Sequence, residues 1–234
     1  MRVLVANPNS TSAITQACVG LAQETASPGT EIAGWTNDAG PPVVDSVYAD
    51  YLAGAALIRG LIALRPVPDA VVLAGFGNYG TAAVKEALDA PVVSMAEAAM
   101  ALGGLLCHRF VIITTSPRMV PYTEDLVRLA GFDGRCAGVR AVALPPVGGP
   151  APAEGAVVVE LAAEVARAEG ELGADLVILG GARLSPYAAE LRRRVCVPVL
   201  EPVACAVQIA EGLVRLDLHQ SKTGRFAPPP ALSV

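Results

Sequence analysis

The stretches DAVVLAG at residues 69–75 and DLVILGG at residues 175–181 decide the fold. Each is a short run of apolar residues that ends in glycine, which is the pattern of a strand buried on both faces of a parallel sheet. The second stretch follows the first at an offset of 106 residues (175 − 69 = 106). Two further pairs of runs repeat in the same order, 3–7 with 110–114 (110 − 3 = 107) and 91–94 with 198–201 (198 − 91 = 107). Three ordered matches predict an internal duplication.

Helical stretches follow most of these runs, as in parallel sheets that are flanked by helices. The predicted fold class is therefore α/β, with two pseudo-symmetric, Rossmann-like parallel-sheet lobes and the ligand site between them. We place the first lobe at residues 1–97 plus 207–234 and the second at 98–206. The alternative to a duplication is one doubly wound fold, in which similar strands recur at similar spacing.

Composition excludes several classes of protein. The chain has 234 residues, a formal charge of −5 and a pI near 5.1, and its one dense basic cluster, 192–194, ends a helical pattern. Nucleic acid is therefore not an expected partner. No run approaches the roughly 20 apolar residues of a membrane-spanning helix. Residues 1–6 enter a strand pattern without the features of a signal peptide, so we expect a cytoplasmic protein.

The five cysteines are scattered at positions 18, 107, 136, 196 and 205, and only two histidines accompany them. The spacing contains no CxxC pair, which argues against a zinc site or a disulfide framework. We expect Cys18 and Cys205 in helices, Cys107 and Cys196 ahead of strands, and Cys136 in a loop. A reactive thiol needs an exposed electropositive setting, so all five are interpreted as structural.

The ligand site is expected beyond the carboxyl ends of the strands, where loops enter the following helices. Glycine allows backbone N–H groups to approach an anion closely, although the same glycines would also suit tight turns. Hydroxyl and amide side chains at these places could bind a carboxylate or ring carbonyl, or could cap the helices. The predicted substrate-binding residues are Asn7, Ser10, Thr11, Gly75, Phe76, Gly77, Asn78, Thr114, Thr115, Ser116, Gly181 and Ala182.

Three side chains near these strand ends are candidates for catalysis. A phenol is a poor base at neutral pH unless a cation lowers its pKa, and a pair of Tyr79 with Arg183 would supply one. Arg183 alone could hold a substrate carboxylate. Glu97 could act as a base or bind an amine. The alternatives are polar residues on a loop rim for Tyr79 and Arg183, and a solvated carboxylate at a helix start for Glu97 and for Glu201.

The motifs together resemble the aspartate/glutamate/hydantoin racemase superfamily, nearest to its hydantoin racemase branch. They are NPNST at 7–11, the turn at 76–77, EAA at 97–99, the threonines at 114–115 and the tail SKTG at 221–224 that leads to prolines. The resemblance implies two lobes, no cofactor, a small-molecule substrate and a homo-oligomer, and the spacing of the cysteines and histidines leads us to expect no metal. The tail at 221–230 is expected on the surface or in an oligomer contact.

Members of this superfamily typically place one cysteine after each central strand, so that two opposed thiols exchange a proton with a carbon. In this sequence Gly75 and Gly181 occupy those two positions. The resemblance therefore implies a racemase-family isomerase that acts on an amino-acid-, amide- or hydantoin-like compound without the two-cysteine mechanism. The alternatives are a lyase, cyclase or decarboxylase of a biosynthetic pathway, and a non-catalytic protein that binds a small acid.

Overall fold

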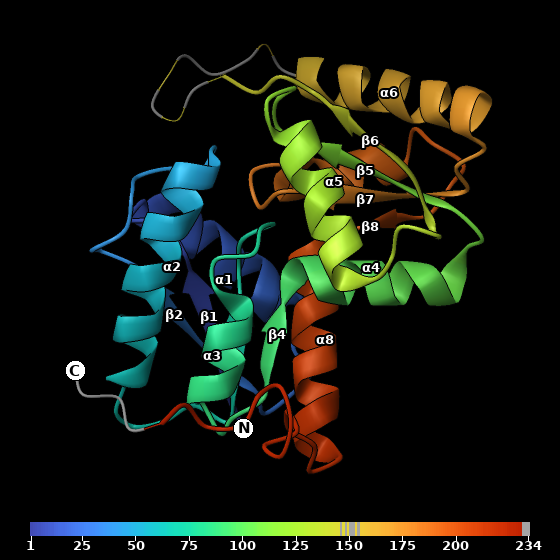
Figure 1. Ribbon diagram of the computed structural model, residues 1–234. Coiled ribbons are helices and arrows are strands. Elements are labelled where there is room, and N and C mark those ends of the chain that lie inside the picture. Colours follow the sequence, from blue (N-terminus) through green and yellow to red (C-terminus); the bar gives the residue numbers. More distant parts are fainter. Residues whose placement is uncertain (146, 148, 150–152, 154, 231–234) are drawn as a thin grey trace. The chain divides into compact units, whose positions relative to one another are not determined.

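The computed structural model describes residues 1–145, 147, 149, 153 and 155–230 (Figure 1). The chain divides into two compact units, of which unit 1 comprises Met1–Met95 and Ala206–Val234 and unit 2 comprises Ala96–Cys205. Each unit is built on a four-stranded parallel sheet. The two sheets have the same strand order, and the predicted α/β fold class is confirmed.

The sheet of unit 1 has the order β2-β1-β3-β4. Its elements along the chain are β1 (Arg2–Asn7), α1 (Ser12–Thr25), β2 (Glu31–Thr36), α2 (Val47–Ile62), β3 (Ala70–Leu73), α3 (Thr81–Ala87) and β4 (Val92–Ser94). Leu57 and Leu61 of α2 and Val84 of α3 pack on Leu4 and Leu73 of the strands, so these two helices cover one face. Figure 1 shows α2 and α3 side by side on this face.

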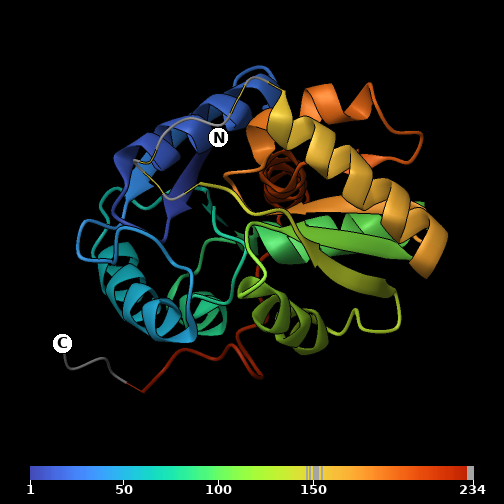
Figure 2. The same ribbon diagram turned by 90° about the horizontal axis from the view of Figure 1, so that it is seen from above.

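The sheet of unit 2 has the corresponding order β6-β5-β7-β8. Its elements are α4 (Met95–Leu106), β5 (Phe110–Thr114), α5 (Met119–Ala130), β6 (Cys136–Ala141), α6 (Ala156–Leu172), β7 (Leu176–Gly180), the short 3-10 helix η1 (Ser185–Tyr187), α7 (Ala188–Arg192) and β8 (Val199–Leu200). Helix α8 (Pro202–Arg215) begins in unit 2 and continues into unit 1 from Ala206. Helix α6 packs through Leu161 and Val165 on one face of the sheet. In Figure 2, α6 lies on the opposite side of this sheet from α5.

Matched aspartates show the internal repeat at the level of hydrogen bonds. Asp69, before β3, accepts a hydrogen bond from the backbone N–H of Arg2 at 2.6 Å. Asp175, before β7, accepts one from the N–H of Arg109 at 2.9 Å. In each unit this carboxylate therefore accepts a backbone N–H at or just before the start of the neighbouring strand.

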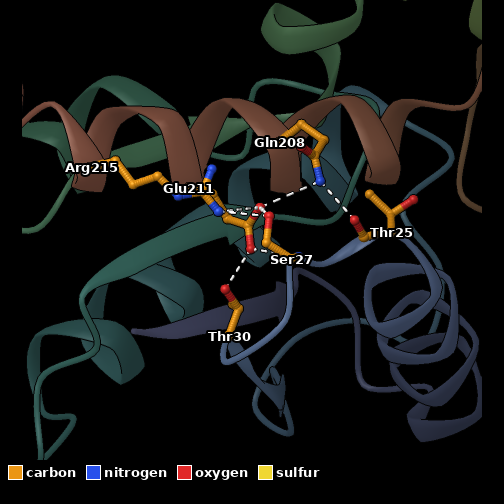
Figure 3. Close-up of polar contacts among 6 residues, drawn as sticks. All are labelled: Thr25, Ser27, Thr30, Gln208, Glu211 and Arg215. Carbon is orange, nitrogen blue, oxygen red and sulfur yellow. Dashed lines mark hydrogen bonds and ion pairs between the residues drawn. The ribbon is translucent and has the colours of Figure 1, made fainter.

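A buried carboxylate joins the last helix to the rest of unit 1 (Figure 3). Glu211 of α8 is fully buried, and it accepts hydrogen bonds from the N–H and Oγ of Ser27 and from Oγ1 of Thr30. Arg215, one turn further along α8, lies 3.2 Å from the same carboxylate. Burial by itself would raise the pKa of Glu211, but these hydrogen bonds and the charge of Arg215 lower it below its ordinary value.

The tail after α8 packs on its own unit. Nζ of Lys222 donates to the carbonyl oxygens of Lys85, Glu86 and Leu88 at the end of α3. A helix carboxyl end presents unpaired carbonyl groups, and a cation there satisfies them. Lys85 in turn lies over the ring of Phe226. The described part of the tail therefore packs against α3 and binds its carboxyl end.

Candidate functional site at the strand ends

The loop after β1 is built on an internal amide network. Asn7 is fully buried, and its Nδ2 donates to Oδ1 of Asn9, to the carbonyl of Thr11 and to Oγ1 of Thr15. Its Oδ1 accepts the N–H of Asn9. Oγ1 of Thr11 donates to the carbonyl of Pro42, and the N–H of Ser10 donates to the carbonyl of Pro41. The structure thus uses Asn7 to shape this loop and joins the loop to the segment before α2.

The turn after β3 holds unpaired backbone donors. Gly75, Phe76 and Gly77 are buried. Within the described residues, the backbone N–H groups of these three positions make no hydrogen bond. Buried N–H groups without a partner are rare in native proteins, because each costs free energy comparable to a lost hydrogen bond. Three in succession make this turn a candidate site for an anion or an oxyanion.

The ring of Tyr79 covers the same turn. A β-carbon built on Gly75 would lie 2.8 Å from Cζ of Tyr79 and 2.6 Å from Cγ of Pro8, so these two side chains fill the space that a side chain at position 75 would need. The phenol oxygen is one bond from Cζ and therefore lies in the immediate neighbourhood of that space. Tyr79 is only 5% exposed, so it is not the rim residue that the sequence left open as an alternative.

Helix α2 fixes the backbone at Tyr79. Tyr79 has a φ of +43°, which is unusual for a residue with a side chain. Oδ1 of Asp50, which is itself buried, accepts the N–H of Tyr79 at 2.8 Å. Gly54, one turn along α2, lets the backbone approach: a β-carbon there would lie 3.0 Å from the carbonyl carbon of Tyr79. Positive φ outside glycine stores strain and clusters at functional loops.

The corresponding turn of unit 2 is arranged differently. The N–H of Gly181 donates to the carbonyl of Leu179, and the carbonyl of Gly181 accepts the N–H of Leu184. A β-carbon on Gly181 would lie 3.2 Å from the Cγ2 methyl of Thr115, so a small side chain needs only a slight shift there. Thr114 is buried, with its Oγ1 at 3.4 Å from the carbonyl of Gly180. Gly181 is thus part of a hydrogen-bonded turn, and Ala182 and Ser116 are half-buried.

The remaining candidate residues, Arg183, Glu97 and Asn78, differ in their surroundings. The guanidinium of Arg183 donates to the carbonyl of Pro145, and burial lowers its pKa from the ordinary value. Glu97 is half-buried in the first turn of α4. Asn78 offers its carbonyl to the N–H and Oγ1 of Thr81 at the start of α3. Each therefore lies in or beside a loop at the carboxyl end of a strand.

A comparison with protein-family models identifies the family of the chain. Residues 3–210 match the model described as "Asp/Glu/Hydantoin racemase". The chain belongs to the Asp/Glu/hydantoin racemase family.

Relatives within this racemase family match the chain over nearly its whole length. A hydantoin racemase of Paenarthrobacter aurescens is 36% identical over 233 residues, which cover 98% of both chains. The structure of an allantoin racemase from Pseudomonas fluorescens superposes with a TM-score of 0.94 at 37% identity and covers 100% of this chain and 99% of that one. An allantoin racemase from Klebsiella pneumoniae gives a TM-score of 0.93 at 32% identity, with 100% and 96% covered.

The cysteines of this racemase-family chain are all free thiols. Burial and the charge of Asp175 raise the pKa of Cys107 to about 11, and burial and Glu201 raise that of Cys205 to about 12. Burial also raises the pKa of Cys136. Raised values keep these three thiols protonated at neutral pH, which makes them weak bases and nucleophiles. Cys136 begins β6, so its expected position in a loop was wrong.

Two buried acidic residues near the strand ends, Asp50 and Glu201, were not predicted correctly from the sequence. Asp50 was missed, although its spacing from Ala53, Gly54 and Leu57 places a carboxylate on the apolar face of α2, and that mismatch was a usable signal. Glu201 was considered as a solvated helix-start residue, but it is only 4% exposed. Its carboxylate accepts Oγ of Ser185 at 2.5 Å and the N–H groups of residues 203 and 204, and it thereby caps α8.

Residues 1–145, 147, 149, 153 and 155–230 contain no group of three or more His, Cys, Asp or Glu residues placed to hold a metal ion. None of the helices in these ranges combines the length and the apolar character that a membrane span requires.

Proposed function

We propose that this family member is a cofactor-independent racemase, or related isomerase, which acts in the cytoplasm on a small compound with a hydantoin-, amide- or amino-acid-like centre. In this proposal, no pair of cysteines transfers the proton. The observation that carries it is the turn at Gly75, Phe76 and Gly77, where three buried backbone N–H groups have no partner within the described residues. Such a turn suits an oxygen atom that gains negative charge during a reaction.

A hydantoin ring is the substrate class that we favour. The names of the relatives at 32–37% identity refer to hydantoin and to allantoin, and allantoin is a hydantoin with a ureido group on carbon 5. Carbon 5 of the ring carries a hydrogen next to a carbonyl group. Removal of that hydrogen as a proton leaves an enolate whose oxygen carries negative charge, and return of a proton to either face of the carbon gives the racemic product. Donors at Gly75–Gly77 would stabilise the enolate oxygen.

Tyr79 is our proposed proton-transfer residue at this turn. Its phenol lies beside the space above Gly75, where the resemblance leads us to expect a thiol. A positioned side chain that exchanges a proton with the reacting carbon contributes about 10²–10⁴-fold to the rate. Arg183 and Glu97 remain candidates for the second proton donor and for substrate binding, with Thr114, Thr115 and Ser116 as further contacts.

An exchange assay tests the proposal. Each enantiomer of allantoin and of several 5-substituted hydantoins is incubated with the protein in deuterated water, and chiral chromatography with mass spectrometry follows inversion and deuterium uptake. We expect both to occur with at least one compound above the rate without protein. Amino acids and their amides form the second arm of the panel. Absence of inversion and exchange throughout the panel would refute the isomerase proposal.

A second function is favoured by the packing of Tyr79. Because Tyr79 and Pro8 fill the space above Gly75, the turn has an anion site whose nearest side chains are an aromatic and an apolar ring. This arrangement also fits a lyase, cyclase or decarboxylase, in which a carbanion forms by bond cleavage, and it fits a protein that only binds a small acid. Mass spectrometry separates these cases: a product of changed mass supports the first, and a bound compound that stays unchanged supports the second.

A further inference from the structure

A groove of about 810 Å³ lies between α2 and the segment that follows β2, and we call it the α2 groove. The residues of α2 that line it are Leu52, Ala55, Ala56, Arg59 and Gly60. Trp35 and the segment 36–41 line the other side. Small-molecule sites in proteins have volumes of about 300–1,000 Å³ and mostly apolar walls with a few polar groups. In size and in composition the α2 groove therefore suits a small-molecule ligand.

The α2 groove is separate from the candidate site at the strand ends. At about 3.6 residues per turn, Leu52 and Arg59 lie on the opposite side of α2 from Asp50 and Gly54. Asp50 accepts the N–H of Tyr79, and Gly54 lies against the backbone of the same residue. One side of the helix thus contacts the turn at Tyr79, and the other side lines the groove.

The two walls of the α2 groove are joined to each other. Asn37 is buried, and its Nδ2 donates to the carbonyl of Ala53 of α2 at 3.1 Å and to the carbonyl of Pro8 at 2.9 Å. Gly60 of α2 leaves room for the indole ring, since a β-carbon there would lie 2.8 Å from Cη2 of Trp35. These contacts form the groove before any ligand binds, as is usual for small-molecule sites.

Two charged side chains of opposite sign line the α2 groove, Arg59 and Asp38. Both are exposed, and within the described residues neither side chain has a hydrogen bond or an ion pair. A purely anionic ligand would pair with Arg59 but would be repelled by Asp38, and a purely cationic ligand would meet the reverse. A ligand that carries both charges can pair with both groups. The charges therefore favour a zwitterion.

We propose that the α2 groove binds an α-amino acid with an aromatic side chain. The carboxylate pairs with the guanidinium of Arg59, the ammonium group pairs with the carboxylate of Asp38, and the ring packs against Trp35 and Leu52. This binding goes beyond the proposed function, because it needs neither the turn at Gly75 nor a reaction there. A chain that racemises nothing could still bind the amino acid, so the two proposals can fail separately.

Tryptophan fluorescence tests the proposal directly. Trp35 is the only tryptophan of the chain, and phenylalanine does not absorb the light that excites it selectively. We expect L-phenylalanine to change this fluorescence in a saturable manner, and isothermal titration calorimetry to give the same dissociation constant. Arg59→Ala and Asp38→Ala should each raise that constant about tenfold. Arg193→Ala, which removes an exposed arginine of unit 2, is the control and should leave the constant unchanged.

Filling the α2 groove is a second test. Ala55 is exposed, so Ala55→Phe places a ring in the groove and leaves the core unchanged. We expect this variant to bind L-phenylalanine at least about tenfold more weakly than wild type. Ala166→Phe, at an exposed position of α6, is the matched control. Circular dichroism melting verifies that each variant is folded.

Ligand analogues test the assignment of the two charges. Phenylpropanoate lacks the ammonium group, and L-phenylalanine amide lacks the carboxylate. Arg59→Ala should weaken binding of phenylpropanoate but not of the amide, and Asp38→Ala should weaken binding of the amide but not of phenylpropanoate. No saturable change with L-phenylalanine, undiminished binding to Ala55→Phe, or the same response of both analogues to each variant would overturn the proposal.

Discussion

The ring of Tyr79 lies where a side chain on Gly75 would have to be. A β-carbon on Gly75 would approach Cζ of Tyr79 to 2.8 Å, closer than real β-carbons come to other atoms. The two residues therefore depend on each other, since glycine makes room for the ring and the ring covers the turn that glycine forms. At position 181 a built β-carbon would meet, among the described residues, only the Cγ2 methyl of Thr115 at 3.2 Å.

Alanine substitution should distinguish the two glycines. Neither Gly75 nor Gly181 has a positive φ, so the difference comes from packing alone. We expect Gly75→Ala to lower the free energy of unfolding by about 1–3 kcal/mol, because it overpacks the turn, and Gly181→Ala to lower it less. Urea unfolding measures both. On the background of Tyr79→Ala, the cost of Gly75→Ala should shrink, and equal costs on both backgrounds would contradict the packing account.

Removal of one hydroxyl group tests the role of Tyr79. Tyr79→Phe keeps the ring over Gly75 and removes the atom that would exchange the proton. We expect deuterium exchange into the substrate to fall about 100-fold or more, and circular dichroism verifies that the variant is folded. Tyr122→Phe on α5 is the control for loss of a phenol elsewhere. An unchanged exchange rate in Tyr79→Phe would remove Tyr79 from the mechanism.

The contact between Asp50 and Tyr79 predicts a graded effect on stability. Asp50→Ala leaves the buried N–H of Tyr79 without its acceptor, which should cost about 1–3 kcal/mol of unfolding free energy. Asp50→Asn retains an acceptor oxygen at nearly the same place and should cost less. Chemical denaturation of the two variants gives the comparison, and a larger loss for Asn than for Ala would argue against this hydrogen bond as the cause.

The lowered pKa of Glu211 leads us to expect that the free energy of unfolding depends on pH. Its pKa is lowered in the folded chain, so it stabilises the fold above the ordinary glutamate value of about 4.3, and this stabilisation disappears as the pH falls through the lower folded value. We expect Glu211→Gln to be less stable at pH 7 and to lose less stability on acidification than wild type. Glu24→Gln, at an exposed position on α1, is the control. Parallel pH curves for wild type and Glu211→Gln would exclude this role.

The strands with buried apolar runs were predictable, and the edge strands β2 and β6 were not. β3 and β7 lie inside their sheets and are buried at every position, which gives the uninterrupted apolar runs that the sequence shows. β2 and β6 lie at the edges, and their residues are mostly half-buried. β2 and β6 therefore lack an uninterrupted apolar run, and β6 also contains Gly138 and Arg140. Cys136 was placed in a loop for this reason.

The sequence indicated the turns of the candidate site but not their internal contacts. The glycines at 75–77 and their position after a strand follow from the chain itself. The ring of Tyr79 lies over Gly75 because Tyr79 has a positive φ, because Asp50 accepts its N–H and because Gly54 leaves room for its backbone. Asp50 and Gly54 belong to α2, which is distant from Tyr79 in sequence. Tertiary contacts of this kind leave no local pattern, apart from the carboxylate on the apolar face of α2.

A cysteine-free chain tests the central claim most directly. Cys18 and Cys205 are replaced by alanine and Cys107, Cys136 and Cys196 by serine, and circular dichroism verifies that the product is folded. The measurement is the rate of deuterium incorporation at carbon 5 of the hydantoin that the wild-type chain racemises best. Our account predicts the wild-type rate, because no thiol takes part in proton transfer. A folded cysteine-free chain that no longer exchanges the proton would contradict it.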